Sequence, residues 1–340
     1  MIGTASVPAR YEEVAPGCAI DLSDNTNLWG PPPSVVRAMA SDSGRSVSRY
    51  PSAYSNDLKS TIAKYAGLES TMVATGCGSD DILDSALRAF GERGDTVAML
   101  DPTFSMMRSF ASISGLAISP ISFDEPDIPL AFRSKAARIS YLCSPNNPTG
   151  GALSAQVIES IVAEALGIVI VDEAYIDFGG VASVALLKRY ENVLITRTLS
   201  KAFGLAGFRV GYGLGSADVI GRVEAARGPY KVSAVSERVA IDVLTNDSDW
   251  VKARAAEVID NRRHLILELS KLGCTALDSS ANFVLVPVRD AARIERAMRK
   301  RSIAVRALTG LAGIGDAVRI TVGPWDVMER CICALREVLQ

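Results

Sequence analysis

The sequence predicts an α/β protein whose main sheet is largely parallel. Between about residues 72 and 215, short β-rich segments alternate with segments of helical period, as in a sheet covered by helices. Several β-rich segments are apolar at consecutive positions, which is typical of strands buried on both faces. The 340 residues, of which 48% are hydrophobic and 22% charged, suffice for a large core in about two domains.

Five strands are expected in this first region. They span residues 96–100, 138–143, 167–172, 192–196 and 209–213. Apolar residues recur at helical spacing between residues 82 and 90, and again between 157 and 165. Strands and helices therefore alternate along the chain, which favours parallel strands joined by helical crossovers.

After about residue 233 the pattern changes to that of a smaller α+β unit. A long helical stretch is interrupted near residues 246–248 and runs to residue 272. Strand 283–288, helix 291–299, strand 318–322 and a last helix opened by Pro324 follow. We therefore expect an N-terminal arm over residues 1–35 that packs on the small domain. A large domain over 36–235 and a small domain over 236–340 complete the predicted organisation.

The composition argues against several classes of protein. With 36 Lys and Arg against 38 Asp and Glu and no basic stripe, a nucleic-acid partner is not expected. The single histidine, His264, excludes a multi-histidine zinc site, and no metal site is expected. The six cysteines form no CxxC pair and fit free thiols in a reducing compartment. The sequence has no secretion signal and no membrane-spanning apolar run, so a cytoplasmic protein is expected.

Polar residues cluster where the predicted strands end, which is where open α/β sheets bind ligands. The glycine-rich segment 76–81 leads into a helix whose first amides could hold an anion, although its Ser and Asp also fit a plain helix cap. Asp172 ends a buried strand and needs a cationic partner, in a structural ion pair or in a site. Lys201 lies among hydroxyls and glycines in segment 196–204. Burial there would lower its pKa and make it a usable nucleophile and base.

Four segments together resemble the fold-type I pyridoxal-phosphate aminotransferases in order and spacing. They are SPNNPTG at 144–150, DEAY at 172–175, TLSKAFGLAGFRVGY at 198–212 and VRITVG at 318–323. The resemblance is closest to the histidinol-phosphate aminotransferase branch, through RYP at 49–51, GCGSD at 76–80, DPTFSM at 101–106 and the short chain. It implies the fold-type I architecture, pyridoxal 5′-phosphate as cofactor and a homodimer with shared active sites.

The resemblance implies a role for each matching residue around the cofactor ring. Lys201 would carry the cofactor and move a proton between substrate and cofactor. Asp172 would pair with the pyridine nitrogen and keep it protonated. Tyr175 and Asn147 would hydrogen-bond the ring hydroxyl oxygen, and Phe104 would stack on the ring face.

The resemblance also assigns the cofactor phosphate to a helix start and a guanidinium, a combination suited to an anion. The residues implied are Thr198, Ser200, Arg209 and the backbone amides of Gly78, Ser79 and Asp80. Tyr50 would reach the phosphate from the neighbouring subunit.

For the substrate, the resemblance implies two arginines. Arg319 matches the arginine that faces a substrate carboxylate or phosphate, and Arg306 matches a second one. Two guanidiniums suit a phosphate dianion, but related enzymes for aromatic amino acids also carry the second arginine. Where the branch tends to read NENPYG, this chain reads NTNLWG at 25–30, so Asn27 and Trp29 border an altered substrate pocket. Another amino or oxo acid substrate therefore stays open.

The leading interpretation is an aminotransferase that uses an amino-acid donor such as glutamate and a small oxo substrate. Two alternatives within the same fold are a transaminase of a specialised biosynthetic pathway and an amino-acid-phosphate decarboxylase. A cofactor-binding regulator is less consistent with the sequence. The roughly 35 residues before the core leave no room for a DNA-binding domain, and Lys201 is present.

Overall fold

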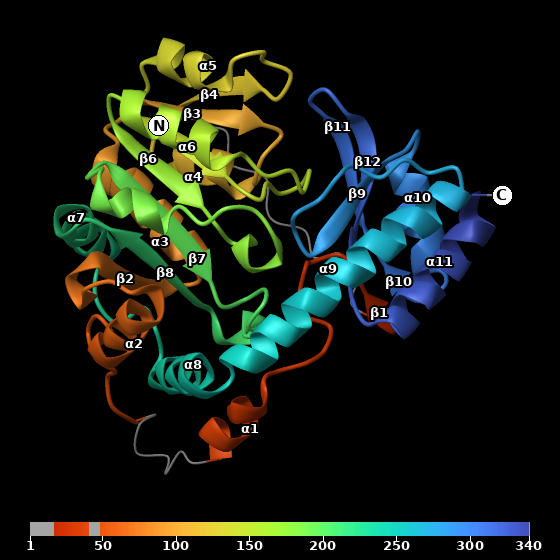
Figure 1. Cartoon of the computed structure of the whole chain (residues 1–340), viewed down its shortest axis with the longest axis horizontal. Coiled ribbons are helices and arrows are strands. Elements are labelled where there is room, and N and C mark those ends of the chain that lie inside the picture. Colours follow the sequence, from red (N-terminus) through yellow and green to blue (C-terminus); the bar gives the residue numbers. More distant parts are fainter. Residues whose placement is uncertain (1–16, 41–47, 340) are drawn as a thin grey trace, which may run out of the picture.

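The protein is described by a computed structural model that covers residues 17–40 and 48–339. Seven strands form the main sheet: Val73–Cys77 (β2), Thr96–Asp101 (β3), Ala117–Ser122 (β4), Ile139–Cys143 (β5), Ile168–Asp172 (β6), Val193–Thr198 (β7) and Val210–Gly215 (β8). Their order is β2-β8-β7-β6-β5-β3-β4 (Figure 1). Only β8 runs antiparallel to its neighbours. The predicted α/β fold with a mainly parallel sheet is confirmed.

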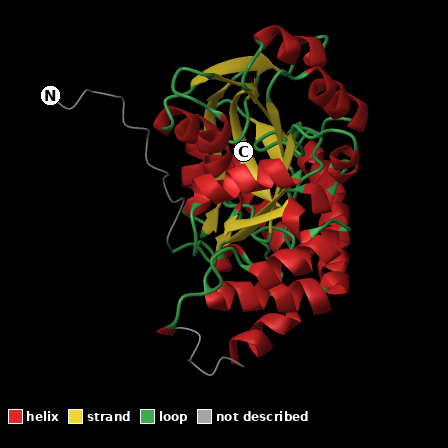
Figure 2. Ribbon diagram, turned by 90° about the vertical axis from the view of Figure 1, so that its left-hand side faces the viewer, coloured by secondary structure: helices red, strands yellow, loops and turns green. Residues whose placement is uncertain are grey.

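Helices cover both faces of this sheet, as Figure 2 shows from the side. Ser79–Phe90 (α3), Met106–Ile113 (α4) and Ala217–Arg227 (α7) pack on one face. Ile128–Lys135 (α5), Ala155–Glu164 (α6) and Ala234–Asn246 (α8) belong to the core on the other face. In β6, Ile170 joins the first core while Val169 and Val171 join the second. This alternation explains why the strand is apolar at its first four positions, Ile168–Val171.

A smaller antiparallel sheet lies beside the main one (Figure 1). It is built from Phe283–Pro287 (β9), Arg306–Leu311 (β11) and Gly315–Thr321 (β12), in the order β11-β12-β9. Ala291–Arg299 (α10) and Trp325–Leu339 (α11) accompany it. The long helix Ser248–Lys271 (α9) follows α8 after Asp247 and connects the two bodies (Figure 1). The helical interruption expected near residues 246–248 is therefore present.

The N-terminal segment contributes to the smaller body. Ile20–Asp21 (β1) pairs in parallel with Ile303–Ala304 (β10), and helix Pro33–Ala40 (α1) then packs against α8. Helix Asn56–Ala66 (α2) also packs against α8. The exact domain boundaries at residues 35/36 and 235/236 stay a prediction, and residues 1–16 of the expected arm lie outside the described residues.

None of the helices in the described part of the chain could span a bilayer. The longest, α9, has 24 residues and carries charged side chains along its length.

Candidate active site

Asp172 lies at the carboxyl end of β6, in the middle of the main sheet. Its side chain is buried, with 3% of its surface exposed. The carboxylate accepts hydrogen bonds from the Tyr141 hydroxyl at 2.8 Å, the Thr196 hydroxyl at 3.1 Å and the Ala174 amide at 3.2 Å. Thr196 and Cys143 flank Asp172 in the parallel register, so strands β5, β6 and β7 build this position together.

The electrostatics of Asp172 leave room for a cation. Burial raises the pKa of Asp172 to about 6, although the hydrogen bonds from Tyr141 and Thr196 act in the opposite direction. Among residues 17–40 and 48–339, no Lys or Arg side chain is within ion-pair distance of this carboxylate. A buried carboxylate without a cation is costly, so a ligand with a positively charged nitrogen would satisfy it.

Lys201 lies in the loop that follows β7. Its ammonium group donates a hydrogen bond to the Asp24 carbonyl at 3.0 Å and is 5.8 Å from the centre of the Tyr175 ring. Burial, together with the positive charge of Arg319, lowers the pKa of Lys201 to about 8. A lysine in this state loses its proton readily, which makes it a usable nucleophile and base.

The start of α3 and the loop after β7 form an anion cradle. Gly78 precedes α3 with φ +80°, and a Cβ atom there would lie 2.6 Å from the Arg209 guanidinium. Arg209 donates to the Ser200 hydroxyl at 3.5 Å, and the Ser200 amide donates to the Thr198 hydroxyl at 3.1 Å. The Asp80 carboxylate lies 3.4 Å from Arg209, and burial raises the pKa of Asp80. The amides of Ser79 and Asp80 in the first turn of α3, together with these hydroxyls and the guanidinium, suit a phosphate, whereas the Gly78 amide already donates to the Gly76 and Arg209 carbonyls.

A second pair of guanidiniums borders the site from the smaller sheet. Arg319 on β12 is 7% exposed and donates to the Asn147 side-chain oxygen and to the Ser23 carbonyl, each at 2.6 Å. Arg306 on β11 is the direct cross-strand partner of Arg319. Directly opposed side chains of an antiparallel pair lie on the same face of the sheet, and like charges placed there repel one another. This position therefore also suits an anion.

The comparisons with known proteins agree with this geometry. The family model "Aminotransferase class I and II" matches residues 19–335. The chain belongs to this family. A histidinol-phosphate aminotransferase of Thermoanaerobacter sp. (strain X514) is 32% identical to it, and the match covers 98% of this chain and 94% of that protein. The corresponding enzyme of Caldanaerobacter subterraneus subsp. tengcongensis is 35% identical over 86% of this chain and 85% of its own length.

Solved aminotransferase structures share the fold. Histidinol-phosphate aminotransferase from Sinorhizobium meliloti, solved in complex with pyridoxal-5′-phosphate, superposes with a TM-score of 0.85 at 25% identity. That match covers 95% of this chain and 91% of the other. L-threonine-O-3-phosphate decarboxylase from Porphyromonas gingivalis has the same TM-score of 0.85 at 22% identity, which shows that the fold also hosts a decarboxylase.

This aminotransferase depends on pyridoxal 5′-phosphate, and its residues fit that group. The buried Asp172 carboxylate has no cation beside it in the described chain and suits a protonated ring nitrogen. Lys201, with its pKa near 8, suits covalent attachment. The cradle at Gly78, which a Cβ would fill, suits the phosphate. The cofactor expected from the sequence is therefore confirmed.

Three other predicted site residues, Tyr175, Asn27 and Phe104, are placed by their own contacts. Tyr175 is buried and its ring meets Phe283 edge-on at 5.2 Å. Asn27 donates to the carbonyl of Ala202, next to Lys201, at 3.0 Å. Phe104 is half-buried in the loop between β3 and α4.

Tyr50 is strongly exposed to solvent. Its side chain is 84% exposed and stacks on Tyr230 with ring centres 4.9 Å apart. Such an exposed position suits a residue that would act in another subunit.

Several residues that contact the site through their side chains were not predicted as site residues, among them Tyr141, Thr196 and Asn25. Tyr141 and Thr196 hold Asp172, and Asn25 contacts Tyr175. A polar side chain on the same face of a neighbouring parallel strand was the available signal for Tyr141 and Thr196. It becomes readable only once the strand register is known.

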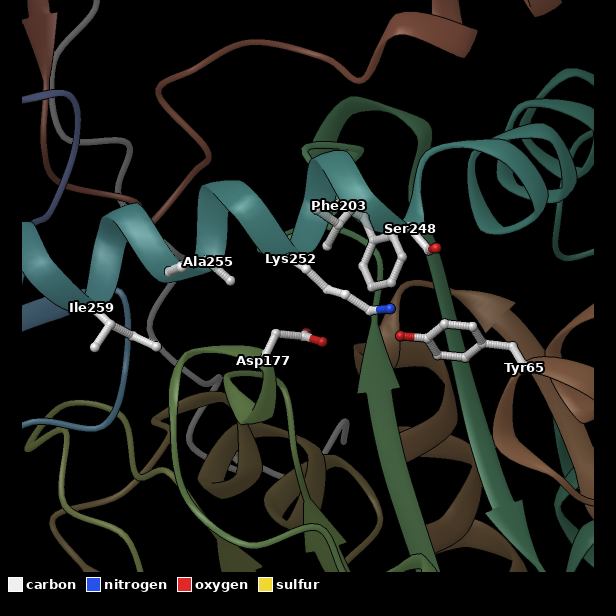
Figure 3. Close-up of a pocket in the computed structure, with 9 residues that line it drawn as sticks. Tyr65, Asp177, Phe203, Ser248, Lys252, Ala255 and Ile259 are labelled. Atoms are coloured by element: carbon white, nitrogen blue, oxygen red, sulfur yellow. The ribbon is translucent and has the colours of Figure 1, made fainter.

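A separate cavity of about 190 Å³ lies between α9 and the main body (Figure 3). Asp177, Lys252 and Tyr65 point their polar ends toward one another there, and Phe203 forms part of the wall (Figure 3). Burial raises the pKa of Asp177 to about 6. The residues that line this cavity include none of the predicted site residues.

Proposed function

We propose that this aminotransferase transfers an amino group between glutamate and a phosphorylated substrate of the histidinol phosphate type. The observation that carries the proposal is the cross-strand pair Arg306 and Arg319 beside the cofactor site. Two guanidiniums on the same face of the small sheet can both donate hydrogen bonds to a phosphate dianion, which suits two positive charges better than a single carboxylate does. The names of the relatives, which are histidinol-phosphate aminotransferases at 32% and 35% identity, support the same choice.

In the proposed mechanism, bound pyridoxal phosphate supplies an electron sink for the bond that breaks at the substrate Cα. Lys201 would remove the proton from the substrate Cα through its Nζ and hold it there. Asp172 holds a proton at the ring nitrogen, and Tyr141 and Thr196 orient its carboxylate. Tyr175 donates its hydroxyl proton toward the ring oxygen.

The remaining cofactor contacts are assigned from the same geometry. Asn147 would also contact the ring oxygen, and Phe104 would stack on the ring. The phosphate would be held by Thr198, Ser200, Arg209 and the amides of Ser79 and Asp80 at the start of α3. Gly78, whose amide is engaged by the Gly76 and Arg209 carbonyls, would contribute by leaving space for the phosphate.

The substrate side is proposed to be specified by the N-terminal segment and the two arginines. Arg319 is already oriented by Asn147 and the Ser23 carbonyl, so its guanidinium loses little freedom on binding. Asn27, fixed to the Ala202 carbonyl, lies in the segment that borders the substrate pocket. The altered sequence of this segment favours, as a second candidate, a different amino or oxo acid from a specialised pathway.

The quaternary structure is proposed to be a homodimer in the cytoplasm. The stacked pair Tyr50 and Tyr230 is an exposed aromatic surface, as interfaces often present, and Tyr50 would complete the phosphate site of the other subunit. All six cysteines are free thiols, which supports a reducing compartment.

Half-reactions test the activity directly. Glutamate added to the holoenzyme should convert the bound cofactor to its pyridoxamine form, which absorbance follows. In a separate sample of the holoenzyme without glutamate, borohydride reduction should trap pyridoxal on the peptide that contains Lys201. Label on another lysine would contradict the assignment, and release of carbon dioxide without pyridoxamine formation would favour a decarboxylase.

Arg306→Met tests the substrate class. A charge-assisted contact to a phosphate is worth about 1.5–3 kcal/mol, so kcat/KM for a phosphorylated substrate should fall about ten- to hundredfold. An unphosphorylated amino acid substrate should lose much less, because Arg319 alone can pair its carboxylate. An equal fall in kcat/KM for both substrates would contradict the assignment of a phosphorylated substrate. An unchanged kcat/KM for both would show that Arg306 does not contact the substrate.

A further inference from the structure

Asn25 occupies a position in the N-terminal segment that few residue types tolerate. It is 1% exposed and has φ +55°, in the left-handed region where Asn is enriched among residues with a side chain. Its backbone amide donates to the Thr321 hydroxyl at 3.0 Å, and its carbonyl accepts from the Asn282 side chain at 3.0 Å. Both partners belong to the smaller body, so the position of Asn25 is determined by residues far away in the sequence.

The side chain of Asn25 points to the cofactor site. Its Nδ2 donates to the Tyr175 hydroxyl oxygen at 3.0 Å, and its Oδ1 faces the Thr321 hydroxyl at 3.3 Å. Thr321 shares its single hydroxyl proton between the Leu22 carbonyl at 2.8 Å and Asn25 Oδ1, so the amide oxygen lies toward Thr321 and the amide nitrogen toward Tyr175. This network ties the N-terminal segment to Tyr175 and to β12 together.

The direction of the hydrogen bond decides where the Tyr175 proton can go. A tyrosine hydroxyl has one proton to donate and can accept from other donors. Since Asn25 donates to its oxygen, the proton of Tyr175 is not used in that contact. Within the described residues no acceptor for this proton is recorded, so it stays available to a ligand.

The surroundings of Tyr175 agree with a hydroxyl that keeps its proton. Burial raises the pKa of Tyr175, while the charge of Arg319 and the hydrogen bond from Asn25 act against this rise. Asp172 and Cys143 also face the phenol, and the Lys201 ammonium lies 5.8 Å from its ring.

We propose that Asn25 is a positioning residue that directs the hydroxyl proton of Tyr175 toward the ring oxygen of the cofactor. The inference rests on the proposed contact of Tyr175 with that oxygen. Only asparagine combines tolerance of the left-handed backbone with an amide donor of this length. Glycine would lack the donor, and aspartate would turn the donor into an acceptor.

The test is the pH at which the absorbance of the bound cofactor changes in the holoenzyme. A proton donated to the ring oxygen stabilises negative charge there, so losing it raises this midpoint. Asn25→Gly keeps the backbone conformation and removes the donor, and we expect an upward shift of about half to one pH unit. Asn25→Asp should shift the midpoint further, because its carboxylate would take the Tyr175 proton for itself.

Tyr175→Phe and Asn282→Ala supply the references. Tyr175→Phe should raise the midpoint, and adding Asn25→Gly to it should produce no further shift, because one hydrogen-bond chain is already broken. Asn282→Ala removes the hydrogen bond to the Asn25 carbonyl without touching the phenol or the Asn25 side chain, so it should leave the midpoint unchanged. A purely structural role for Asn25 would instead give equal thermal destabilisation and equal spectra in Asn25→Gly and Asn282→Ala.

The outcomes separate the two hypotheses. A shift in Tyr175→Phe without one in Asn25→Gly overturns the role of Asn25 and leaves the role of Tyr175 intact. An Asn25→Gly shift that persists in the Tyr175→Phe background also overturns it, because Asn25 would then act by another route. If Tyr175→Phe itself causes no shift, the proposed contact with the ring oxygen is wrong, and the inference falls with it.

Discussion

Two neighbouring carboxylates, Asp172 and Glu173, end the same strand and are both buried, yet their partners differ. Asp172 lies on the face of β6 covered by α3 and receives only hydroxyl and amide hydrogen bonds. Glu173 points to the other face, where Arg197 contacts it at 2.7 Å and the Ser183 amide donates to it at 2.6 Å. Strand alternation separates the two side chains. The protein therefore supplies the cation for Glu173 and leaves that of Asp172 to the cofactor.

The largest effect is expected from breaking the paired carboxylate. Glu173→Gln would leave Arg197 buried without its main counter-charge, which typically costs about 3–5 kcal/mol. Asp177 also faces Arg197, so we expect the lower end of this range. Urea unfolding measures the change. The control is Glu159→Gln, which removes the partner of Arg189 at the surface and should change stability little, because water screens exposed ion pairs. Similar losses in both variants would contradict the comparison.

The next effect concerns turnover. Asp172→Asn should keep the cofactor bound but lower kcat about 10²–10³-fold, as removal of a preorganised electrostatic contact does. Glu173→Gln, assayed well below its unfolding temperature, should retain most of its turnover. Stopped-flow half-reactions with glutamate distinguish the two. Near-normal rates in Asp172→Asn would make Asp172 a structural residue like Glu173.

The smallest effect is a pH dependence of stability in the cofactor-free enzyme. The folded-state pKa of Asp172, about 6, lies above its ordinary value of 3.8. Folding therefore favours the protonated form, and the charged form lowers stability by up to about 3 kcal/mol once the pH exceeds 6. Asp172→Asn should raise the thermal midpoint at pH 7.5, and this gain should shrink by about half at pH 5.

The same experiment sharpens the contrast with Glu173, because Glu173→Gln should lower the midpoint at both pH values. A gain in Asp172→Asn that does not depend on pH would show that the charge of Asp172 is not its cause.

The fold could be predicted best where a strand is buried on both faces. The expected segments 138–143, 167–172 and 192–196 differ from β5, β6 and β7 by at most two residues at either end. Strands β2, β4 and β11 were not expected. β4 is an edge strand with exposed positions and contains Pro120, and β11 is only half-buried, so neither shows the continuous apolar run that marked the others.

The candidate site could be predicted where its residues follow one another along the chain. Lys201, Asp172 and Arg209 stand in motifs that could be read directly. The contacts of Tyr141 with Asp172 and of Asn25 with Tyr175 join residues 31 and 150 positions apart. Such contacts depend on strand register and on domain docking, which no local pattern encodes.

The pairing of β1 with β10 also has a consequence for how the enzyme is made. Ile20 cannot pair with Ile303 until Ile303 has been synthesised. The roughly 280 residues between them take about 15–60 s to make at about 5–20 residues per second. Throughout that time Thr321 has not been made, so the Asn25 amide lacks its hydrogen-bond acceptor. The segment that carries the Asp24 carbonyl, the acceptor for Lys201, is therefore not yet fixed. The large body can form on the ribosome, but the site around Lys201 is completed only after translation has passed β12.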